Sequence, residues 1–437
     1  GVCPARRFHG SSETGRAGLE TTFIDARRIC RLKKILIPQN QNRRAPSADE
    51  IIALLNGVCQ PLAAARTPLH EAAGRVLREP VCAPEDQPPF DRSAMDGFAI
   101  RLDDANLEFK IVDEIRAGDW KPRELQAGEA VQISTGGALP GDGLQVVMKE
   151  NVRVAGKILT VVERDSNRCI RFRGEDARAG QVLVESGTTL TPGALALLAS
   201  IGHAKPMVTR LPRVLHLATG NEIVPPEQTP LTGQIRDSNS VLVRAFLRHW
   251  QITPQQKRVP EDEAAAKSEI SNLKSEVDLL LVSGGASVGE HDFTRRLLEH
   301  FGFEILVCKT ALRPGRPLIV ARRGNQIAFG LPGNPLAHFV CLNLFVRVTL
   351  GKFSGWAAEN IFQPGTLAAK LESGRNARET FWPARSEMKS GEMKLTPLRW
   401  SSSGDLTALA LANSLIRVKA ESSGLAAGAV VEFVPTI

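Results

Sequence analysis

A glycine-rich loop that follows a buried strand is the first candidate for chemistry in this chain. The apolar run from Val277 to Val282 ends at Gly284 and Gly285, and Ser287 and Asp292 follow shortly afterwards. A glycine loop at the end of a buried parallel strand brings backbone N–H groups close to a bound anion. Asp292 is placed to hold a cation or a proton beside that anion. This segment predicts an oxyanion or phosphate site at the edge of an α/β sheet.

A pair of arginines supplies the positive charge that such a site needs. Arg313 and Arg316 flank Pro314-Gly315, which holds the two side chains stiffly relative to each other. Guanidinium groups bind tetrahedral oxyanions through paired N–H donors. A second rigid turn, Pro-Gly-Asn-Pro around Asn334, follows in the sequence.

Carboxylates follow two further segments of the same predicted sheet. Glu222 comes after the strand that ends at Thr219, and Asp237 precedes a predicted helix. Ligands of open α/β sheets bind at the carboxyl ends of the strands, so Glu222, Asp237 and Asp292 should meet at one ligand. Three carboxylates beside an anion are explained if Mg²⁺ lies between them and the anion, because this ion prefers hard oxygen ligands.

Each of these residues also has a purely structural interpretation. Asp237, Asp292 and Asn334 each stand before a predicted helix, where a side-chain cap contributes roughly 1 kcal/mol. Gly284 and Gly285 would then form a tight turn without a ligand, and the two arginines would be solvated. The combination of strand, glycine loop, acid, basic pair and proline turn favours the ligand site over these alternatives.

Three clusters in the first half of the chain are less specific. Asp96 lies in the segment FDRSAMDG, Thr135 lies in a Ser-Thr-Gly-Gly sequence, and Asp176 ends the charged run RFRGED. Thr135 could offer its hydroxyl group and neighbouring backbone amides to a phosphate. From the residues alone, a β-turn without a ligand explains each cluster at least as well.

Apolar periodicity predicts the elements that would position the candidate site. Buried strands in RVLHLATG and VDLLLVS and near 303–308 alternate with helices at 238–250, 261–276, 293–301 and 335–350. Strands alternating with helices predict an α/β multidomain protein whose central domain, residues 211–355, has a doubly wound, mostly parallel sheet.

The flanking segments are typical of smaller domains. Period-two alternation around glycine turns predicts a β-rich lobe at 81–165, and short β segments after about 356 predict a small C-terminal β-barrel at 356–437. Residues 45–80 and 166–210 would form a linking helical and β domain, with helices beginning after Ser47 or Asp49 and after Thr191. Residues 1–44 are expected to form a disordered basic tail.

Composition excludes several classes of protein. The formal charge of +8 is concentrated in residues 1–44, where ten Lys and Arg residues face three acids, so the rest of the chain is nearly neutral. A nearly neutral folded part argues against a nucleic-acid partner. We find no apolar run long enough to predict a membrane-spanning helix. Seven scattered cysteines without a CxxC pair indicate reduced thiols and a cytoplasmic protein.

Six motifs, in the same order and at similar spacing, resemble the molybdopterin molybdenumtransferase family, which is related to the E domain of gephyrin. They are PPFDRSAMDGFAI, STGGALPGDGLQVVM, RFRGEDARAGQVL, SGGASVGEHDF, LRPGRPL and LPGNP. The resemblance covers roughly residues 46–437. It implies a Mg²⁺-assisted enzyme that inserts molybdate into adenylylated molybdopterin, giving molybdenum cofactor and AMP. It also implies a homodimer whose site lies between the α/β domain of one subunit and the β lobe of the other, with molybdopterin adenylyltransferase as a protein partner.

The resemblance assigns roles by position. Asp96 and Thr135 would face the pterin nucleotide, with Gly284, Gly285, Ser287 and Asn334 as further substrate contacts and Lys309 near the phosphates. Asp176, Glu222, Asp237 and Asp292 would form the catalytic acidic set, the last three of them binding Mg²⁺. Arg313 and Arg316, with Arg378 and Ser403 from the C-terminal domain, would hold molybdate.

Two departures from the family pattern affect this site. Lysines are common in the family where this chain has Arg313 and Arg316, and an aspartate is common where it has Asn221. Arginine keeps the positive charge and adds a planar fork, so oxyanion affinity should survive. The alternatives are adenylyltransferase-like nucleotide chemistry, which needs only residues 210–350, and a non-catalytic scaffold on the same fold.

Overall fold

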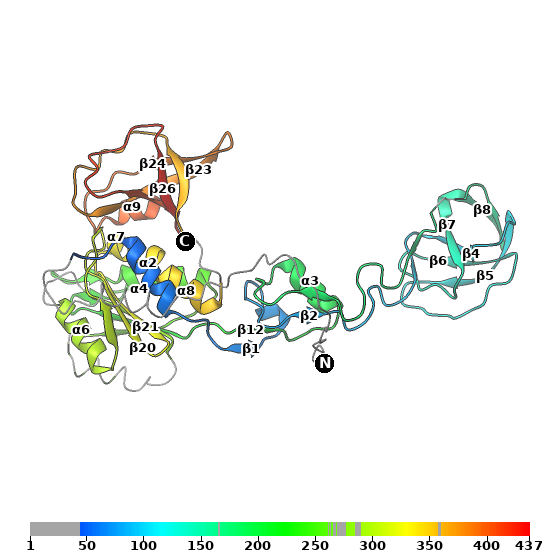
Figure 1. The fold of residues 1–437 in the computed structure, drawn as a ribbon, viewed down its shortest axis with the longest axis horizontal. Coiled ribbons are helices and arrows are strands. Elements are labelled where there is room, and N and C mark those ends of the chain that lie inside the picture. Colours follow the sequence, from blue (N-terminus) through cyan, green and yellow to red (C-terminus); the bar gives the residue numbers. More distant parts are fainter. Residues whose placement is uncertain are drawn as a thin grey trace, which may run out of the picture. The chain divides into compact units, whose positions relative to one another are not determined.

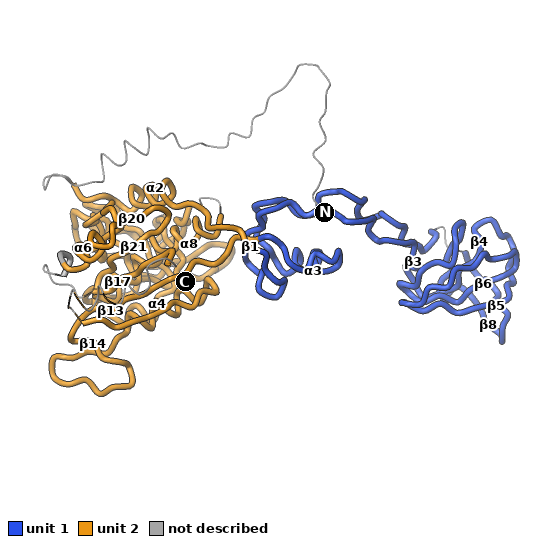
Figure 2. Tube along the Cα trace, turned by 90° about the horizontal axis from the view of Figure 1, so that it is seen from below, with its two compact units in different colours: residues 1–13, 66–207 blue, residues 14–65, 208–437 orange. Residues whose placement is uncertain are grey.

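The computed structural model describes residues 44–164, 167–260, 262, 264, 268, 277–284, 290–356 and 360–437, with residues 290–292 described by backbone alone. Most of the expected basic tail and of the expected helix 261–276 therefore lies outside the described residues. The chain divides into two compact units (Figure 2), whose described parts are residues 66–207 and residues 44–65 with 208–437.

A six-stranded sheet forms the lobe of the first unit. Apolar side chains on its two faces pack into two separate cores, one around Ile115 and Val131 and the other around Phe109 and Val147. The pairing is antiparallel except between β5 and β6. In spatial order the strands are β7 (Leu144–Met148), β4 (Gly97–Arg101), β6 (Glu129–Ile133), β5 (Glu108–Ile115), β9 (Ile158–Val161) and β8 (Val152–Ala155). The predicted β-rich lobe is confirmed.

The remainder of the first unit consists of short elements. Thr191 caps the helix α3 (Pro192–Ser200) by accepting a hydrogen bond from the backbone of Ala194, as its position before Pro192 predicts. The paired short strands are β2 (Val81–Cys82) with β11 (Val182–Val184), and β3 (Arg92–Ser93) with β10 (Ile170–Arg171). The strands β1 (Ala64–Arg66) and β12 (Met207–Thr209) span the two points where the chain passes between the units.

The second unit is built on a six-stranded sheet whose central strands are parallel. In order its strands are β16 (Gln255–Val259), β13 (Val214–Thr219), β17 (Leu279–Ser283), β21 (Gln326–Leu331), β20 (Ile319–Arg323) and β18 (Glu304–Val307). The first four are parallel to one another. β20 runs in the opposite direction, because β20 and β21 form a tight hairpin through Gly324, which has a φ of +60°, and β18 pairs with β20 antiparallel, so that it runs in the same direction as the first four. The expected strand near 303–308 is present, at the edge of the sheet.

Helices cover both faces of this sheet (Figure 1). Leu279 and Leu281 pack against one group of helices, whereas Leu280 and Val282 pack against the helix on the opposite face. This alternation is the one that a strand buried on both sides requires. The helices on the first face are α2 (Ala48–Val58), α4 (Ser238–His249), α7 (Pro335–Cys341) and α8 (Arg347–Ser354), and the helix on the second face is α6 (Glu290–His300). The doubly wound, mostly parallel arrangement is confirmed.

The helix that begins at Pro335 is the most deeply buried one described. It runs through a π-helical segment, η3 (Leu342–Val346), into α8 and ends at Gly355, which has a φ of +86°. Residues Pro335–Ser354 are long and apolar enough to cross a membrane, yet 83% of that stretch is buried inside the unit. Such burial is typical of the central helix of a folded core.

Five strands close into a barrel at the C-terminal end of the chain. They are β22 (Gln363–Leu367), β23 (Glu379–Lys389), β24 (Glu392–Pro397), β25 (Ser414–Val418) and β26 (Val430–Pro435). The ring closes because β23 pairs with both β24 and β25, and Leu395 and Phe433 fill its interior. A short strand, β19 (Leu312–Arg313), adds to β23 and so joins the barrel to the arginine loop. The predicted C-terminal barrel is confirmed.

Candidate functional site

The carboxyl ends of β13 and β17 are held together by a polar contact. The Thr219 hydroxyl group donates to the Ser283 carbonyl oxygen at 3.0 Å, and both residues are buried. A Cβ atom at Gly284 would lie 3.0 Å from that hydroxyl oxygen, so a larger residue where the loop leaves the strand would crowd Thr219. Gly285 and Ser287, the other two predicted contacts of this loop, lie outside the described residues.

Asp237 is buried at the N-terminus of α4 and fully engaged. Its Oδ1 accepts from the Ser240 backbone at 2.9 Å, and its Oδ2 accepts from the Ser240 hydroxyl group at 2.6 Å and from Arg258 Nε at 3.0 Å. Burial raises the pKa of this carboxyl group, but the Ser240 hydrogen bonds and the Arg258 charge outweigh burial and leave the pKa below its ordinary value. The capping alternative for Asp237 is therefore observed.

Glu222 lies on the turn between β13 and β14 (Ile223–Val224), with its carboxylate folded back over Gly220. A Cβ atom at residue 220 would lie 2.7 Å and 2.8 Å from the two carboxylate oxygens, and the φ of +140° there also favours glycine. The side chain of Asp292, the third predicted metal ligand, lies outside the described residues. Over the described part of the chain, no three His, Cys, Asp or Glu side chains form a metal-binding group.

A polar network that the sequence does not reveal runs beneath these strand ends. His216 Nε2 lies 2.7 Å from Ser283 Oγ, and Gln256 Nε2 lies 3.0 Å from His216 Nδ1. Gln256 also donates to the Ser240 carbonyl oxygen at 2.8 Å, which links the network to the helix that Asp237 caps. Complete burial, with the charge of His338 as a further cause, lowers the pKa of His216 to about 3. His216 is therefore neutral at physiological pH.

Three arginines gather where the arginine loop meets the barrel. Arg313 ends β19, Arg316 lies beyond the turn at Gly315, and Arg378 immediately precedes β23, with which β19 pairs. Burial, followed by the positive charges of Arg316 and Arg313, lowers the pKa of Arg378. Arg378 is also tied directly to β19, because its Nη1 donates to the Leu312 carbonyl oxygen at 3.3 Å. Within the part of the chain that the structure describes, none of them forms an ion pair with a carboxylate.

The loop that carries the arginines is fixed by its own hydrogen bonds. The Thr310 hydroxyl group donates to the Gly315 carbonyl oxygen at 2.8 Å, and the Thr310 backbone N–H donates to the Arg316 carbonyl oxygen at 2.9 Å. Gly315 has a φ of +118° and lies against Cys341 of the buried helix. Lys309, the predicted phosphate contact, is exposed at the start of this loop.

Ser403 and Asn334 contact each other directly. Asn334 Nδ2 donates to Ser403 Oγ at 2.9 Å, and the Leu336 backbone N–H donates to the Ser403 carbonyl oxygen at 3.0 Å. Asn334 occupies the N-cap position of α7 but makes no side-chain capping bond, so the capping alternative is wrong for this residue. The Pro-Gly-Asn-Pro turn instead holds the Ser403 segment of the C-terminal domain.

The predicted site residues of the first unit, the nucleotide contacts Asp96 and Thr135 and the catalytic acid Asp176, form two small clusters. Asp96 Oδ1 accepts from the Thr135 backbone at 2.7 Å and from the Thr135 hydroxyl group at 2.8 Å, and these bonds hold the pKa of Asp96 below its ordinary value. Lys149 Nζ lies 3.4 Å from the other Asp96 oxygen. Asp176 is ion-paired with Arg171 and exposed.

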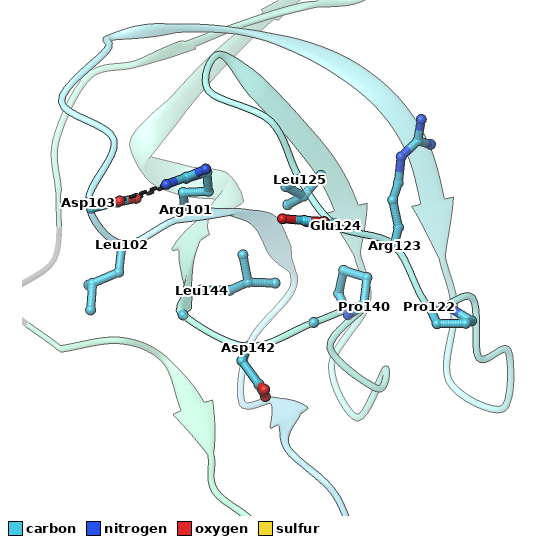
Figure 3. Close-up of a pocket in the computed structure, with 12 residues that line it drawn as sticks. Arg101, Leu102, Asp103, Pro122, Arg123, Glu124, Leu125, Pro140, Asp142 and Leu144 are labelled. Carbon is cyan, nitrogen blue, oxygen red and sulfur yellow. Dashed lines mark hydrogen bonds and ion pairs between the residues drawn. The ribbon is translucent and has the colours of Figure 1, made fainter.

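A pocket of about 860 Å³ opens on the lobe of the first unit, and none of the predicted site residues lines it (Figure 3). Arg101 and Asp103 form an ion pair at its edge, with Arg101 Nη2 and Asp103 Oδ2 2.7 Å apart. The pocket lining carries charges of both signs together with leucine and proline side chains. It has no feature that matches the predicted oxyanion chemistry.

Comparison with known proteins covers nearly the whole described chain. Three family models match in succession: "MoeA N-terminal region (domain I and II)" over residues 46–202, "Probable molybdopterin binding domain" over 216–352 and "MoeA C-terminal region (domain IV)" over 364–436. A protein of Staphylococcus epidermidis named molybdopterin molybdenumtransferase is 30% identical over 380 residues, covering 84% of this chain and 90% of that protein. Its namesake in Staphylococcus aureus is 31% identical over 379 residues, with the same shares covered.

Solved structures show the same likeness. Two crystal structures of the molybdopterin biosynthesis protein MoeA from Pyrococcus horikoshii are 26% identical to this chain and cover 90% of it. Their TM-scores are 0.74 and 0.71, and the matches cover 99% and 100% of those chains.

Proposed function

The chain belongs to the molybdopterin molybdenumtransferase family of molybdenum cofactor biosynthesis, and on that premise we propose that it inserts molybdate into adenylylated molybdopterin. AMP leaves in this reaction and molybdenum cofactor is formed. The family models match the lobe and the barrel as well as the α/β domain. The adenylyltransferase alternative needs only the α/β domain, so the proposal accounts for more of the chain.

The observation that carries the proposal is the cluster of three arginines without a carboxylate partner among the described residues. Arg313, Arg316 and Arg378 come from two separate segments, which are joined where Arg378 Nη1 donates to the Leu312 carbonyl oxygen at 3.3 Å, and burial followed by the positive charges of Arg316 and Arg313 lowers the pKa of Arg378. Like charges that are kept close without a counter-charge are costly unless an anion binds among them. A tetrahedral dianion such as molybdate matches both the charge and the donor geometry of guanidinium groups.

Ser403 would complete the anion site from the barrel side. Its hydroxyl oxygen already accepts from Asn334 Nδ2, so its own proton remains to be donated to a bound oxyanion. The Ser403 backbone is fixed by Leu336 at the same time. In the proposed role, Asn334 positions Ser403, and Ser403 contacts molybdate.

The nucleotide part of the substrate is assigned to two places. Gly284, with Gly285 and Ser287 beyond it, would bring backbone amides to the phosphates, and Lys309 would add a positive charge there. Asp96 and Thr135 on the lobe would contact the pterin nucleotide. In the proposed homodimer these lobe residues would serve the α/β domain of the partner subunit.

The proposed chemistry depends on positioning and charge rather than on a covalent intermediate. Cleavage of the bond to AMP develops negative charge on phosphate oxygens, which fixed cationic groups and N–H donors stabilise. Of the predicted catalytic acids, Glu222 is half-buried beside the strand ends, Asp237 is buried there, and Asp176 lies on the first unit. Their catalytic role, like that of Asp292, remains a proposal.

Mg²⁺ is the cofactor that the resemblance implies, and the described acids do not assemble a site for it. Both Asp237 oxygens are occupied by Ser240 and Arg258, and no three described ligands form a group. No step of the reaction is therefore assigned to the ion. We propose Mg²⁺ dependence as a separate property: EDTA should abolish turnover and excess Mg²⁺ should restore it.

The test of the function is turnover with purified protein, adenylylated molybdopterin, Mg²⁺ and molybdate. AMP release that requires molybdate, together with formation of cofactor, is the expected result. Asp292→Ala should lose turnover while still binding molybdate, since the arginines are intact. Nucleotide binding without cleavage in the wild-type protein would instead support a scaffold.

We propose two further properties: a cytoplasmic location and association with molybdopterin adenylyltransferase. Co-purification of the two proteins from cell extract tests the association.

A further inference from the structure

Arg313 is held by an aromatic ring. Its guanidinium carbon lies 5.4 Å from the centroid of the Trp400 ring, within the range of a cation–π contact. Arg313 is the last residue of β19, whereas Trp400 belongs to the segment between β24 and α9 (Leu406–Leu411). The contact thus joins the arginine loop to the C-terminal domain beside Ser403.

Trp400 is itself fixed in place. Its ring meets the ring of Trp382 edge-on, with centroids 5.6 Å apart and planes at 87°. Trp382, in β23, is anchored because its Nε1 donates to the Leu398 carbonyl oxygen at 2.7 Å. The Trp400 Nε1 is buried and has no hydrogen-bond partner among the residues that the structure describes. The ring position is therefore set by its aromatic and cationic neighbours rather than by a hydrogen bond of its own.

An aromatic ring and a carboxylate can both hold an arginine side chain in place, but only the carboxylate uses up its N–H donors and its charge. A carboxylate would occupy the in-plane N–H donors of Arg313 and neutralise its charge. A tryptophan ring contacts the face of the guanidinium group, so the in-plane donors and the positive charge both stay available. Arg378, in turn, is oriented by donating to the Leu312 carbonyl oxygen at 3.3 Å, which does not neutralise its charge.

We propose that Trp400 is a positioning residue that fixes the guanidinium group of Arg313 with its N–H donors open to a tetrahedral oxyanion. This inference rests on the proposed function, because it takes the arginine cluster to be the molybdate site. Trp400 does not touch the anion in this account; it acts through Arg313. A lysine at position 313 could still contact the ring through its ammonium group, but it lacks the planar fork of in-plane donors that a stacked arginine keeps available.

The test is a double-variant cycle on full-length protein, with sodium molybdate as the titrated probe in calorimetry. Trp400→Leu should weaken molybdate binding about five- to tenfold, as expected for loss of one partly desolvated cation–π contact. Trp400→Phe keeps an aromatic face and should restore binding to within about threefold of wild type. Arg313→Gln removes the cation and should weaken binding, and adding Trp400→Leu to it should change affinity by no more than about twofold.

Controls separate the possible outcomes. Trp120→Leu removes an exposed tryptophan of the first unit and should leave molybdate binding unchanged. Thermal unfolding of each variant identifies misfolding, and Trp400→Phe then carries the test if Trp400→Leu fails to fold. If Arg378→Gln abolishes binding but Trp400→Leu matches wild type, the positioning role is wrong while the anion site stands. If wild-type protein binds no molybdate, the anion site and the role of Trp400 are overturned together.

Discussion

At the scale of single residues, the sequence located the charged groups better than the groups that position them. Arg313 and Arg316 stand out in the sequence itself, whereas Ser403 is implied only by the family resemblance; in the structure Ser403 contacts Asn334. Trp400 was missed because a lone aromatic residue far from the arginine loop carries no spacing signal. The cap at Asp237 was foreseen as an alternative, whereas its pairing with Arg258 depends on how β16 lies beside β13.

Two buried histidines make stability depend on pH. Burial lowers the pKa of His216 to about 3 and that of His338 to about 4, below the value of about 6.5 in an unfolded chain. Between pH 6.5 and 4 the unfolded chain therefore binds protons that the folded chain does not. The free energy of unfolding is highest above pH 6.5 and should fall by about 1 kcal/mol per histidine between pH 7 and 5.5.

The variant His338→Asn removes one of the two groups that take up a proton on unfolding, and so measures the contribution of His338 alone. An asparagine amide can replace His338 Nδ1, which lies 3.0 Å from the Pro332 carbonyl oxygen, but it does not titrate. Urea denaturation at pH 7 and 5.5 should show a smaller loss of stability in this variant than in wild type. An equal loss in both proteins would show that His338 takes up no proton on unfolding.

At the scale of elements, the local sequence predicts where helices and most strands lie, but it does not predict the features that depend on contacts between distant segments. Ser47 and Thr191 cap their helices as predicted, and a full capping box with Glu50 begins α2. The local sequence does not predict the π-helical segment in the buried helix, where Asn343 Oδ1 accepts from the backbone N–H of Ile437 at the far end of the sequence. Barrel closure likewise depends on pairing of β23 with two partners.

One arginine joins α2 to the barrel and gives a test at this scale. Arg417 contacts Asp49 of α2 at 2.6 Å and Glu432 at 3.1 Å, forms a close ion pair with Glu379, and stacks on Phe362 at 4.3 Å. Arg417→Met should lower the free energy of unfolding by about 3–5 kcal/mol, because the buried Glu379 carboxylate loses its counter-charge. Urea denaturation measures this loss.

A second substitution separates charge from packing at this site. In Arg417→Met/Glu379→Gln the buried carboxylate is gone, so the double variant should be more stable than Arg417→Met alone. Equal stability of the two variants would mean that lost packing, rather than the unpaired Glu379, causes the destabilisation.

At the scale of the whole molecule, the predicted site residues fall on two separate units. Asp96, Thr135 and Asp176 belong to the first unit, and the arginines, Glu222 and Asp237 belong to the second. A site could combine the two units of one chain, or the first unit of one chain with the second unit of another. The order of the motifs along the sequence is the same in both arrangements, so the sequence does not distinguish them. The proposed homodimer, in which the lobe of one subunit serves the other, makes a specific prediction.

Complementation between two inactive variants tests that arrangement. A heterodimer of Asp96→Ala and Arg378→Gln subunits, isolated with two different affinity tags, would contain one intact site if each site uses both subunits. We expect about half of the wild-type turnover per dimer. Inactive heterodimers, or a particle mass near the 47.4 kDa of a single chain, would contradict shared sites.

The molybdate KM of Arg378→Gln tests directly whether the arginine cluster holds molybdate for transfer. Loss of one charge-assisted donor should raise this KM about 10- to 100-fold, while the KM for the nucleotide substrate stays near wild type. The matched control is Arg375→Gln, an exposed arginine that is paired with Glu421 and should leave both values unchanged. A molybdate KM equal to that of wild type in Arg378→Gln would contradict the account.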